Sequence, residues 1–489
     1  MKFANFTGVK SLLFENKTIK QTIFKNTFWL GLAEGVTKIL NLILFIYAAR
    51  ILGATEYGKL TFAFAFVGLF TVLTEFGVPN IMVREFAKEK RREQDFPAII
   101  SLALLLNIGT LLLIMLGSYF VTPDSIVRKV IWILALYTSL NVLTHFFCSF
   151  FRARQQMQYE SITKIFRVLI LVILGFYILL NFPSVENLSC GYLFASFAAL
   201  GLIILIFYHE VGPLQIVWSK TIWKKFLSMS WPLALAGIFG TIYTQIDSVM
   251  MGHFGQITQT GWYNAAYRII GTTLIPLSLI STSFYPVLSK YFKESRRDFQ
   301  KVWNYQVEIL IFLSIPIIIG GFVLSSKIIY SVYGLDFFPS ILAFQILIWM
   351  VGVYYLSSPF QSVLVISNEQ KKIFWIVFSG AIANIILNLI LIPKFSLYGA
   401  AVATVATYFL IFLLSVYFAS KLTAVQFLNF NLFFSFVNAI FSSIVMYLVI
   451  SQPLIYNLNI FLSVLVGAMV YILSFFVFRI ILQHFKFYD

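Results

Sequence analysis

Fourteen long apolar segments dominate this sequence and limit what it can fold into. A helix of about 20 apolar residues crosses the hydrocarbon core of a bilayer. Only 11% of the 489 residues are charged and the mean hydropathy is +0.89, whereas a soluble domain carries about 25% charged residues. We therefore predict an all-α polytopic membrane protein with 14 transmembrane helices. The predicted spans are 27–51, 59–80, 97–121, 127–150, 161–181, 189–208, 226–252, 261–285, 303–324, 340–366, 373–392, 397–418, 430–450 and 458–482.

Basic residues are distributed unevenly between the two sets of loops. If the N-terminus lies in the cytoplasm, 24 of the 35 Lys and Arg residues fall in cytoplasmic segments and 5 in the opposite loops. Cytoplasmic loops of membrane proteins are enriched in Lys and Arg. This distribution predicts that both termini are cytoplasmic, and it accounts for the net charge of +16 without a nucleic acid partner.

Residues 1–26 do not have the form of a cleavable signal peptide. Lysines alternate with Phe, Val and Leu, and no apolar core of about 7–15 residues with a small-residue cleavage site follows. We predict an amphipathic segment that lies on the cytoplasmic surface of the membrane.

The chain also repeats a unit of six spans. Span 1 leads into span 2 through ARILGATEYGKLTFAFAF, and span 7 leads into span 8 through SVMMGHFGQITQTGWYNAAYRI. In each, one glycine is predicted to end a helix (Gly53, Gly252) and another to open the next (Gly58, Gly261). The links after spans 4 and 10, RARQQMQYES and ISNEQKKIFW, also correspond. Both units start on the same side of the membrane, so the repeat is parallel and predicts two six-helix lobes.

The repeat divides the chain into five predicted parts. They are the N-terminal segment 1–26, the lobes 27–210 and 226–418, the interfacial linker 211–225 between them, and an appended helix pair with its tail, 419–489.

Four blocks of this sequence resemble those of a known family. They are ARILGATEYGKLTFAFAFVGLFTVLTEFGVPNIMVRE, IDSVMMGHFGQITQTGWYNAAYRI, YGLDFFPSILAFQIL and NIILNLILIPKFSLYGAAVATV. In this order they resemble the Wzx-type polysaccharide biosynthesis flippases, which belong to the multidrug/oligosaccharidyl-lipid/polysaccharide (MOP) exporter superfamily. The resemblance covers about residues 20–480.

The resemblance implies two six-helix lobes around a central cavity that opens alternately to the two sides of the membrane. It implies that polyprenyl-pyrophosphate-linked oligosaccharide repeat units move from the inner to the outer leaflet of the cytoplasmic membrane, for assembly of a surface polysaccharide such as O-antigen. The expected partners are membrane lipid and a polysaccharide polymerase or ligase. No enzymatic step, cofactor or metal is implied. The sequence has no G-x-x-x-x-G-K-[ST] motif for nucleotide binding, so transport driven directly by ATP hydrolysis is disfavoured. Coupling to an H⁺ or Na⁺ gradient is left open.

Ionisable groups within the spans are the candidate site residues. Each costs about 2.5–3.5 kcal/mol on insertion scales and usually faces a cavity or a partner. Glu34 and Lys38 stand four residues apart in span 1 and so share one helix face. They could form a self-neutralising pair, or Lys38 could bind substrate phosphate while Glu34 holds or tunes it. We assign Lys38 to substrate binding and Glu34 to gating or ion coupling.

Asp247 and Arg268 stand before and after the turn between spans 7 and 8, at similar depth. They could pair across this hairpin, or Arg268 could bind pyrophosphate, which suits the planar donors of a guanidinium group. A pair that opens when substrate arrives would serve as a gate. We assign Arg268 to substrate binding and Asp247 to gating or ion coupling.

Three more residues complete the predicted site. Arg50, near the outer end of span 1, and Arg167, two turns into span 5, are assigned to substrate binding. His145 in span 4 is assigned to ion coupling because a histidine titrates near neutral pH, although such a residue is more often a satisfied hydrogen-bonding group. Glu75 and Glu308, near cytoplasmic ends, are interpreted as solvated or paired.

Other functions stay open at this stage. An ion-coupled multidrug exporter of the same superfamily would be expected to use buried acids for organic cations, whereas the deep charges here are mixed. A lipid II flippase shares the fourteen spans, but the quoted blocks match the polysaccharide family better. A membrane-embedded glycosyltransferase is disfavoured because the outer loops are short. Cys148 and Cys190 lie in apolar stretches and are interpreted as small hydrophobic residues, not as a disulfide.

Overall fold

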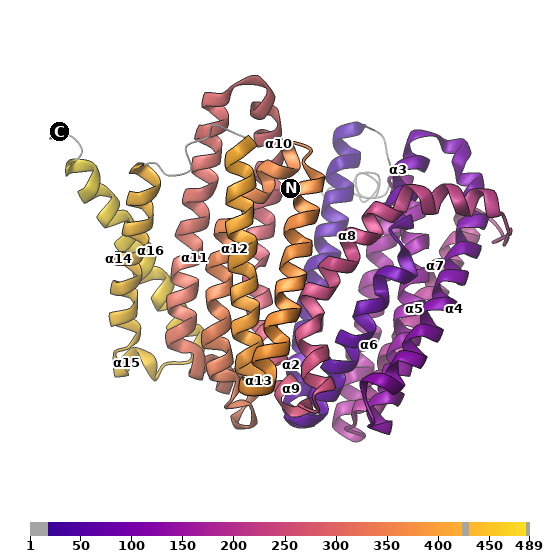
Figure 1. The fold of residues 1–489 in the computed structure, drawn as a ribbon, viewed down its shortest axis with the longest axis horizontal. Helices are drawn as coiled ribbons and strands as arrows, with labels where there is room; N and C mark the ends of the chain where they lie inside the picture. Colours follow the sequence, from indigo (N-terminus) through magenta and orange to yellow (C-terminus); the bar gives the residue numbers. More distant parts are fainter. Residues whose placement is uncertain (1–17, 423–429, 486–489) are drawn as a thin grey trace, which may run out of the picture. The chain divides into compact units, whose positions relative to one another are not determined.

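The computed structural model describes residues 18–422 and 430–485, and within these ranges it contains helices and no strand (Figure 1). The all-α prediction is therefore confirmed for the described part of the chain. Most of the amphipathic segment predicted for residues 1–26 lies outside the described residues. Thr18 caps the first described helix, where its Oγ1 accepts a hydrogen bond from the N–H of Gln21 at 3.2 Å.

Helices follow one another along the whole described chain. The first are α2 (Ile19–Glu75), α3 (Val78–Lys88), the 3₁₀ helix η1 (Lys90–Asp95), α4 (Phe96–Val121), α5 (Ser125–Ala153), α6 (Met157–Asn181), α7 (Val185–Glu210) and α8 (Lys220–His253). The others are α9 (Ile257–Thr273), α10 (Ile275–Glu294), α11 (Arg296–Tyr333), the 3₁₀ helix η2 (Leu335–Phe337), α12 (Ser340–Ile366), α13 (Gln370–Leu422), α14 (Phe430–Ile450), α15 (Pro453–Tyr456) and α16 (Ile460–Phe485).

Twelve segments of the described residues are long and apolar enough to cross a membrane, so this is a multi-pass membrane protein. Two of its helices are too long for one crossing, since α2 has 57 residues and α13 has 53, whereas about 20 residues suffice. Each contains one break in helical geometry, at Gly53 (φ 74°, ψ 172°) and at Ser396 (φ 53°, ψ −132°). The breaks lie where the sequence predicts the outer turns after spans 1 and 11. The count of 14 crossings stays a prediction.

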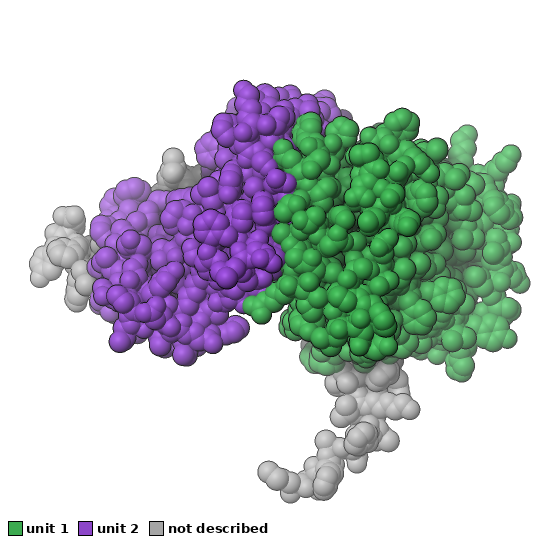
Figure 2. Space-filling view, turned by 90° about the horizontal axis from the view of Figure 1, so that it is seen from below, with its two compact units in different colours: residues 1–258 green, residues 259–489 purple. Residues whose placement is uncertain are grey.

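Contacts divide the chain into two compact units, residues 1–258 and 259–489 (Figure 2). Helix α8 belongs to the first unit, where it packs against α2, α3 and α4. The sequence repeat places the corresponding span, 226–252, in the predicted second lobe. The division into six-helix lobes rests on the sequence repeat and stays a prediction.

The linker predicted for residues 211–225 joins α7 to α8. Its last residues, from Lys220 onward, form the first turns of α8. The indole Nε1 of Trp223 donates to the carbonyl oxygen of Ala98 at 2.9 Å and to Oγ of Ser101 at 3.2 Å. These bonds tie the start of α8 to α4.

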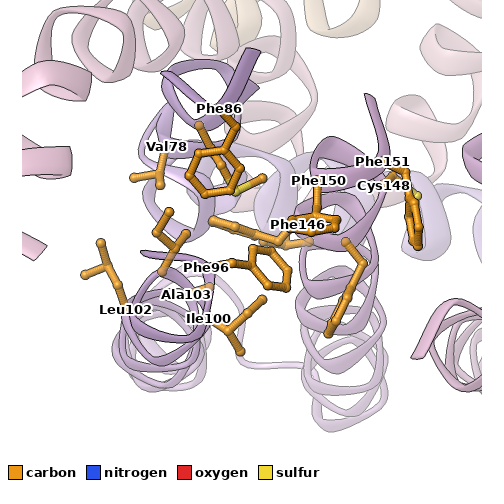
Figure 3. Packing of buried hydrophobic residues seen from close by; sticks show 14 of the residues in the cluster. Val78, Phe86, Phe96, Ile100, Leu102, Ala103, Phe146, Cys148, Phe150 and Phe151 are labelled. Carbon is orange, nitrogen blue, oxygen red and sulfur yellow. The ribbon is translucent and has the colours of Figure 1, made fainter. Parts of the chain in front are cut away.

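An aromatic cluster forms a core within the first unit (Figure 3). The ring of Phe96 lies 4.6 Å from that of Phe150 and 5.2 Å from that of Phe207, measured between centroids. Aromatic pairs bury large areas and gain from tilted and edge-to-face geometries, so this cluster fixes α4, α5 and α7 together. Cys148 is buried in it, Cys190 is exposed on α7, and both thiols are free, as predicted.

Three turns between helices use the same backbone conformation. The residue with positive φ is Gln155 (59°) between α5 and α6, Gly255 (75°) between α8 and α9, and Asn368 (59°) between α12 and α13. In each turn its N–H bonds the carbonyl oxygen three residues earlier, and the next N–H bonds the one five residues before itself. The first and third turns are the links that the sequence repeat pairs. The repeat is therefore visible in local structure.

Gly252 stands at the end of α8, as predicted, one residue before its last residue, His253. Gly261 does not open the next helix but lies one turn inside α9, and the left-handed residue of the turn between them is Gly255. A Cβ on Gly252 would lie 2.0 Å from a ring carbon of Phe62 in α2. The glycine therefore lets α8 approach α2 closely.

We predict that Gly252→Ala destabilises the first unit. The ring of Phe62 is fully buried (0% exposed), and forcing extra atoms into a packed core costs about 1–3 kcal/mol. The midpoint of thermal unfolding of the detergent-purified protein should fall. Gly240→Ala in the same helix is the matched control, because nothing lies within 4 Å of a Cβ there. An equal loss in both variants would contradict the prediction.

Candidate functional site

A cavity of about 310 Å³ lies within the first unit, lined by residues of α2, α5, α6 and α7. Its titratable side chains include Glu75, His145, Lys164 and Arg167. The fold thus brings together two residues that the sequence analysis assigned to different roles, His145 and Arg167.

His145 and Glu75 form a pair across the cavity wall. Nδ1 of His145 in α5 lies 2.9 Å from Oε1 of Glu75 in α2. Both side chains are about one third exposed, at 32% and 30%. Glu75 is therefore paired, which was one of its two predicted states. The ion-coupling role of His145 stays a prediction.

Arg167 projects from α6 toward α5. Its Nη1 donates to Oδ1 of Asn141, a neutral amide. Among the residues that the structure describes, Arg167 forms no ion pair. A guanidinium group carries five N–H donors, so the bond to Asn141 leaves donors for a second acceptor.

A chain of charged side chains connects α2, α6 and α5 beside this cavity. Nζ of Lys164 lies 3.0 Å from Glu34 and 3.0 Å from Glu160. The other carboxylate oxygen of Glu34 lies 3.9 Å from Nζ of Lys38. Glu160 has no exposed side-chain area, and two nitrogens of Arg152 hold it at 2.5 and 3.0 Å. The predicted Glu34–Lys38 pair is thus one part of a larger network.

Sequence reasoning missed the centre of this network. The predicted spans leave Arg152 and Glu160 in the link between spans 4 and 5, where no site residue was expected. The spacing of Glu160 and Lys164, four residues apart at the start of α6, was the available signal, because such residues share a helix face. The contact of Lys164 with Glu34 joins residues 130 apart in the chain and gave no such signal.

The remaining predicted site residues lie elsewhere. Arg50 is exposed on α2, three residues before the break at Gly53. Asp247 is buried in α8 (3% exposed) and belongs to the first unit, whereas Arg268 is half-buried in α9 and belongs to the second. The pairing of Asp247 with Arg268 stays a prediction.

The cavity in the first unit is suited to binding an oxyanion. Hydroxyl, amide and guanidinium groups line it, and the ammonium of Lys164 already has two carboxylate partners. Charge-assisted hydrogen bonds from Arg to phosphate oxygens are among the strongest in proteins. Arg167 is the side chain of this wall best placed to make them.

Comparison with known proteins places this architecture in a family. A family model described as "Polysaccharide biosynthesis protein" matches residues 23–292, and the MatE model matches residues 232–390. The capsular polysaccharide biosynthesis protein CapF of Staphylococcus aureus is 22% identical over 81% of this chain and 99% of its own length. The probable low-salt glycan biosynthesis flippase Agl15 of Haloferax volcanii is 25% identical over 40% of this chain and 41% of its own length.

Solved structures show the same fold. The lipid II flippase MurJ in an inward closed conformation superposes with a TM-score of 0.76 at 18% identity, over 93% of this chain and 99% of that one. The family model covers more than half of the chain. The chain therefore belongs to the polysaccharide biosynthesis protein family, within the MOP exporter superfamily that its sequence blocks resemble.

Proposed function

We propose that this protein flips polyprenyl-pyrophosphate-linked oligosaccharide repeat units from the inner to the outer leaflet of the cytoplasmic membrane by alternating access. The names of two relatives support this substrate class, since Agl15 is named a probable glycan biosynthesis flippase and CapF a capsular polysaccharide biosynthesis protein. The glycan would be destined for a surface polysaccharide. A polymerase or ligase would then receive it.

The state of Arg167 carries the proposal. This cation lines a cavity inside a membrane protein, and within the described residues its side-chain partner is a neutral amide. A cation in apolar surroundings is stabilised by an anion close by. A pyrophosphate head would supply that anion, and its two phosphates could accept from the planar donors of the guanidinium group.

The other cations assigned to substrate binding would contact the same head group one after another as it passes through the protein. Lys38 is exposed and lies at the end of the charged network, so it would meet the substrate first. Arg268 and Arg50 would hold the head group later in the cycle. The polyprenyl tail would stay in lipid throughout, because moving an apolar chain from lipid into a polar cavity is unfavourable in free energy.

Proton movement is the coupling that we propose. The His145–Glu75 pair lines the same cavity as Arg167, so a change in its protonation would alter the charge that the pyrophosphate meets. With both termini in the cytoplasm, as the distribution of Lys and Arg predicts, α5 and α2 would carry this pair near the cytoplasmic side.

Removal of the positive charge at Arg167 should slow translocation. The test uses proteoliposomes with a fluorescent polyprenyl-pyrophosphate disaccharide and a membrane-impermeant quencher that reports its leaflet. We expect Arg167→Gln to slow flipping at least tenfold, since one lost charge-assisted hydrogen bond is worth about 1.5–3 kcal/mol. Lys38→Gln should also lower the rate of flipping.

Arg128→Gln is the matched control. Arg128 lies near the start of α5, outside the cavity lining, and its guanidinium donates to the backbone carbonyl oxygen of Pro123. A lipid II probe and a cationic dye are tested in parallel. If Arg167→Gln flips the probe at the wild-type rate, Arg167 does not bind the phosphate and this site is ruled out. Transport of the dye alone would identify a multidrug exporter, and transport of lipid II alone a peptidoglycan flippase.

His145→Gln should flatten the pH dependence of flipping. If proton exchange at the His145–Glu75 pair drives the cycle, the wild-type rate should depend on pH. The matched control is His209→Gln, since His209 is exposed at the end of α7 and lies 3.7 Å from Glu210. The same pH profile in His145→Gln and in the wild type would exclude the pair from coupling.

A further inference from the structure

A basic surface lies at one end of the first unit, and it includes no residue that lines the cavity described above. It consists of Lys90 and Arg91 in η1 and of Lys220 and Lys224 in the first turns of α8, and all four side chains are exposed. Helix α3, which leads into η1, packs against α8. The start of α8 lies at the same end of the first unit as α3 (Figure 1). Two segments far apart in the sequence therefore supply one surface.

An ion pair and a hydrogen-bonded tryptophan hold these two segments together. Nζ of Lys225 in α8 lies 3.7 Å from a carboxylate oxygen of Asp95, the last residue of η1. The indole of Trp223 in α8 donates to Ala98 and Ser101 of α4, which follows η1 directly. Each of the four cations of the basic surface stands within five residues of Lys225 or Asp95. Their charges are therefore gathered in one region of the folded chain.

The acids of α3 and η1 are already engaged by other cations. Their ion pairs are Glu85 with Arg84, Lys88 and Arg92, Glu89 with Arg92, Glu93 with Arg154, and Asp95 with Lys225. By contrast, the four cations of the basic surface form no ion pair with any residue in the described ranges 18–422 and 430–485. The basic surface therefore has a net positive charge that an anionic partner would neutralise.

Exposed apolar side chains stand directly before the cations of α8. They belong to Ile216, Val217 and Trp218, and Trp218 is 65% exposed. The backbone here is fixed to the start of α4, because the N–H of Val217 donates to the carbonyl oxygen of Pro97 at 3.4 Å, and the carbonyl oxygen of Val217 accepts from Oγ of Ser101 at 2.6 Å. Tryptophan is enriched where a membrane meets water. The surface thus presents cations and an interfacial aromatic ring together.

A phospholipid of the inner leaflet matches both parts of this surface. In the predicted topology η1 and the start of α8 are cytoplasmic and adjoin membrane spans, which places them near headgroup phosphates. Clusters of Lys and Arg at such positions attract anionic lipids. The exposed apolar side chains favour a lipid over inorganic phosphate, because a small soluble anion offers them no apolar contact.

We propose that the basic surface binds anionic phospholipids of the inner leaflet, such as phosphatidylglycerol. The four cations would bind the headgroup phosphates through charge-assisted hydrogen bonds. Trp218 would lie at the boundary between the headgroups and the acyl chains. The lipids would thereby hold the start of α8 and η1 at the membrane surface and stabilise the first unit. A zwitterionic phosphatidylcholine would bind more weakly, since its own cation opposes the approach of the lysines and Arg91.

The test measures thermal unfolding of the delipidated, detergent-purified protein titrated with dioctanoyl phosphatidylglycerol or phosphatidylcholine. We expect phosphatidylglycerol to raise the midpoint, as a ligand of the folded state does, and phosphatidylcholine to change it little. The double variants Lys90→Gln/Arg91→Gln and Lys220→Gln/Lys224→Gln should each bind phosphatidylglycerol about tenfold more weakly, since every Lys or Arg beside anionic headgroups adds to binding. High salt should weaken binding to the wild type, because salt screens exposed charges.

Arg128→Gln/Lys129→Gln is the matched control, because it removes two cations from the start of α5, outside the basic surface. Wild-type affinity for phosphatidylglycerol in both test variants would overturn the proposal, and so would an equal loss of affinity in the control. Flipping of the glycolipid probe is measured as well, in vesicles of pure phosphatidylcholine. A test variant that slows flipping there would assign these cations to the transported substrate and not to a resident lipid.

Discussion

A fully buried carboxylate in an apolar protein needs cations beside it, and the first unit is arranged around this requirement. Glu160 has no exposed area, yet two cations from α5 and α6 hold its carboxylate. Removing one partner of a buried ion pair leaves an uncompensated charge and is far more costly than never having had the pair. Because Lys164 also reaches Glu34, the same network fixes α2 against α6. The network thus adds ionic contacts between these helices to their apolar packing.

Packing in the first unit then follows from a few close approaches. The aromatic cluster around Phe96 and Phe150 fixes α4, α5 and α7, while Gly252 admits the ring of Phe62 and lets α8 lie against α2. In a membrane, lipid competes with apolar side chains as a partner, so close fit between helices contributes more than apolarity alone. The glycine and the buried charges provide that fit.

Local features of the sequence predicted the all-α class and the multi-pass character of the chain. Hydropathy located the membrane segments, and the repeat paired two links that adopt the same turn around Gln155 and Asn368. The Glu34–Lys38 contact followed from helical spacing alone. Contacts between distant segments could not be derived in this way, because His145 and Glu75 stand 70 residues apart and no pattern in either segment refers to the other. The close approach of Gly252 to Phe62 could not be derived for the same reason, since Phe62 lies in another helix.

The charges beside the cavity of the first unit argue for an anionic ligand. The carboxylates of Glu34 and Glu160 are engaged by lysine and arginine, and the Glu75 carboxylate has His145 as its partner. Arg167 is the cation that lines this cavity against a neutral amide. A ligand that brings a negative charge therefore matches this wall better than a cation does, which is why a pyrophosphate head group fits it and an organic cation does not.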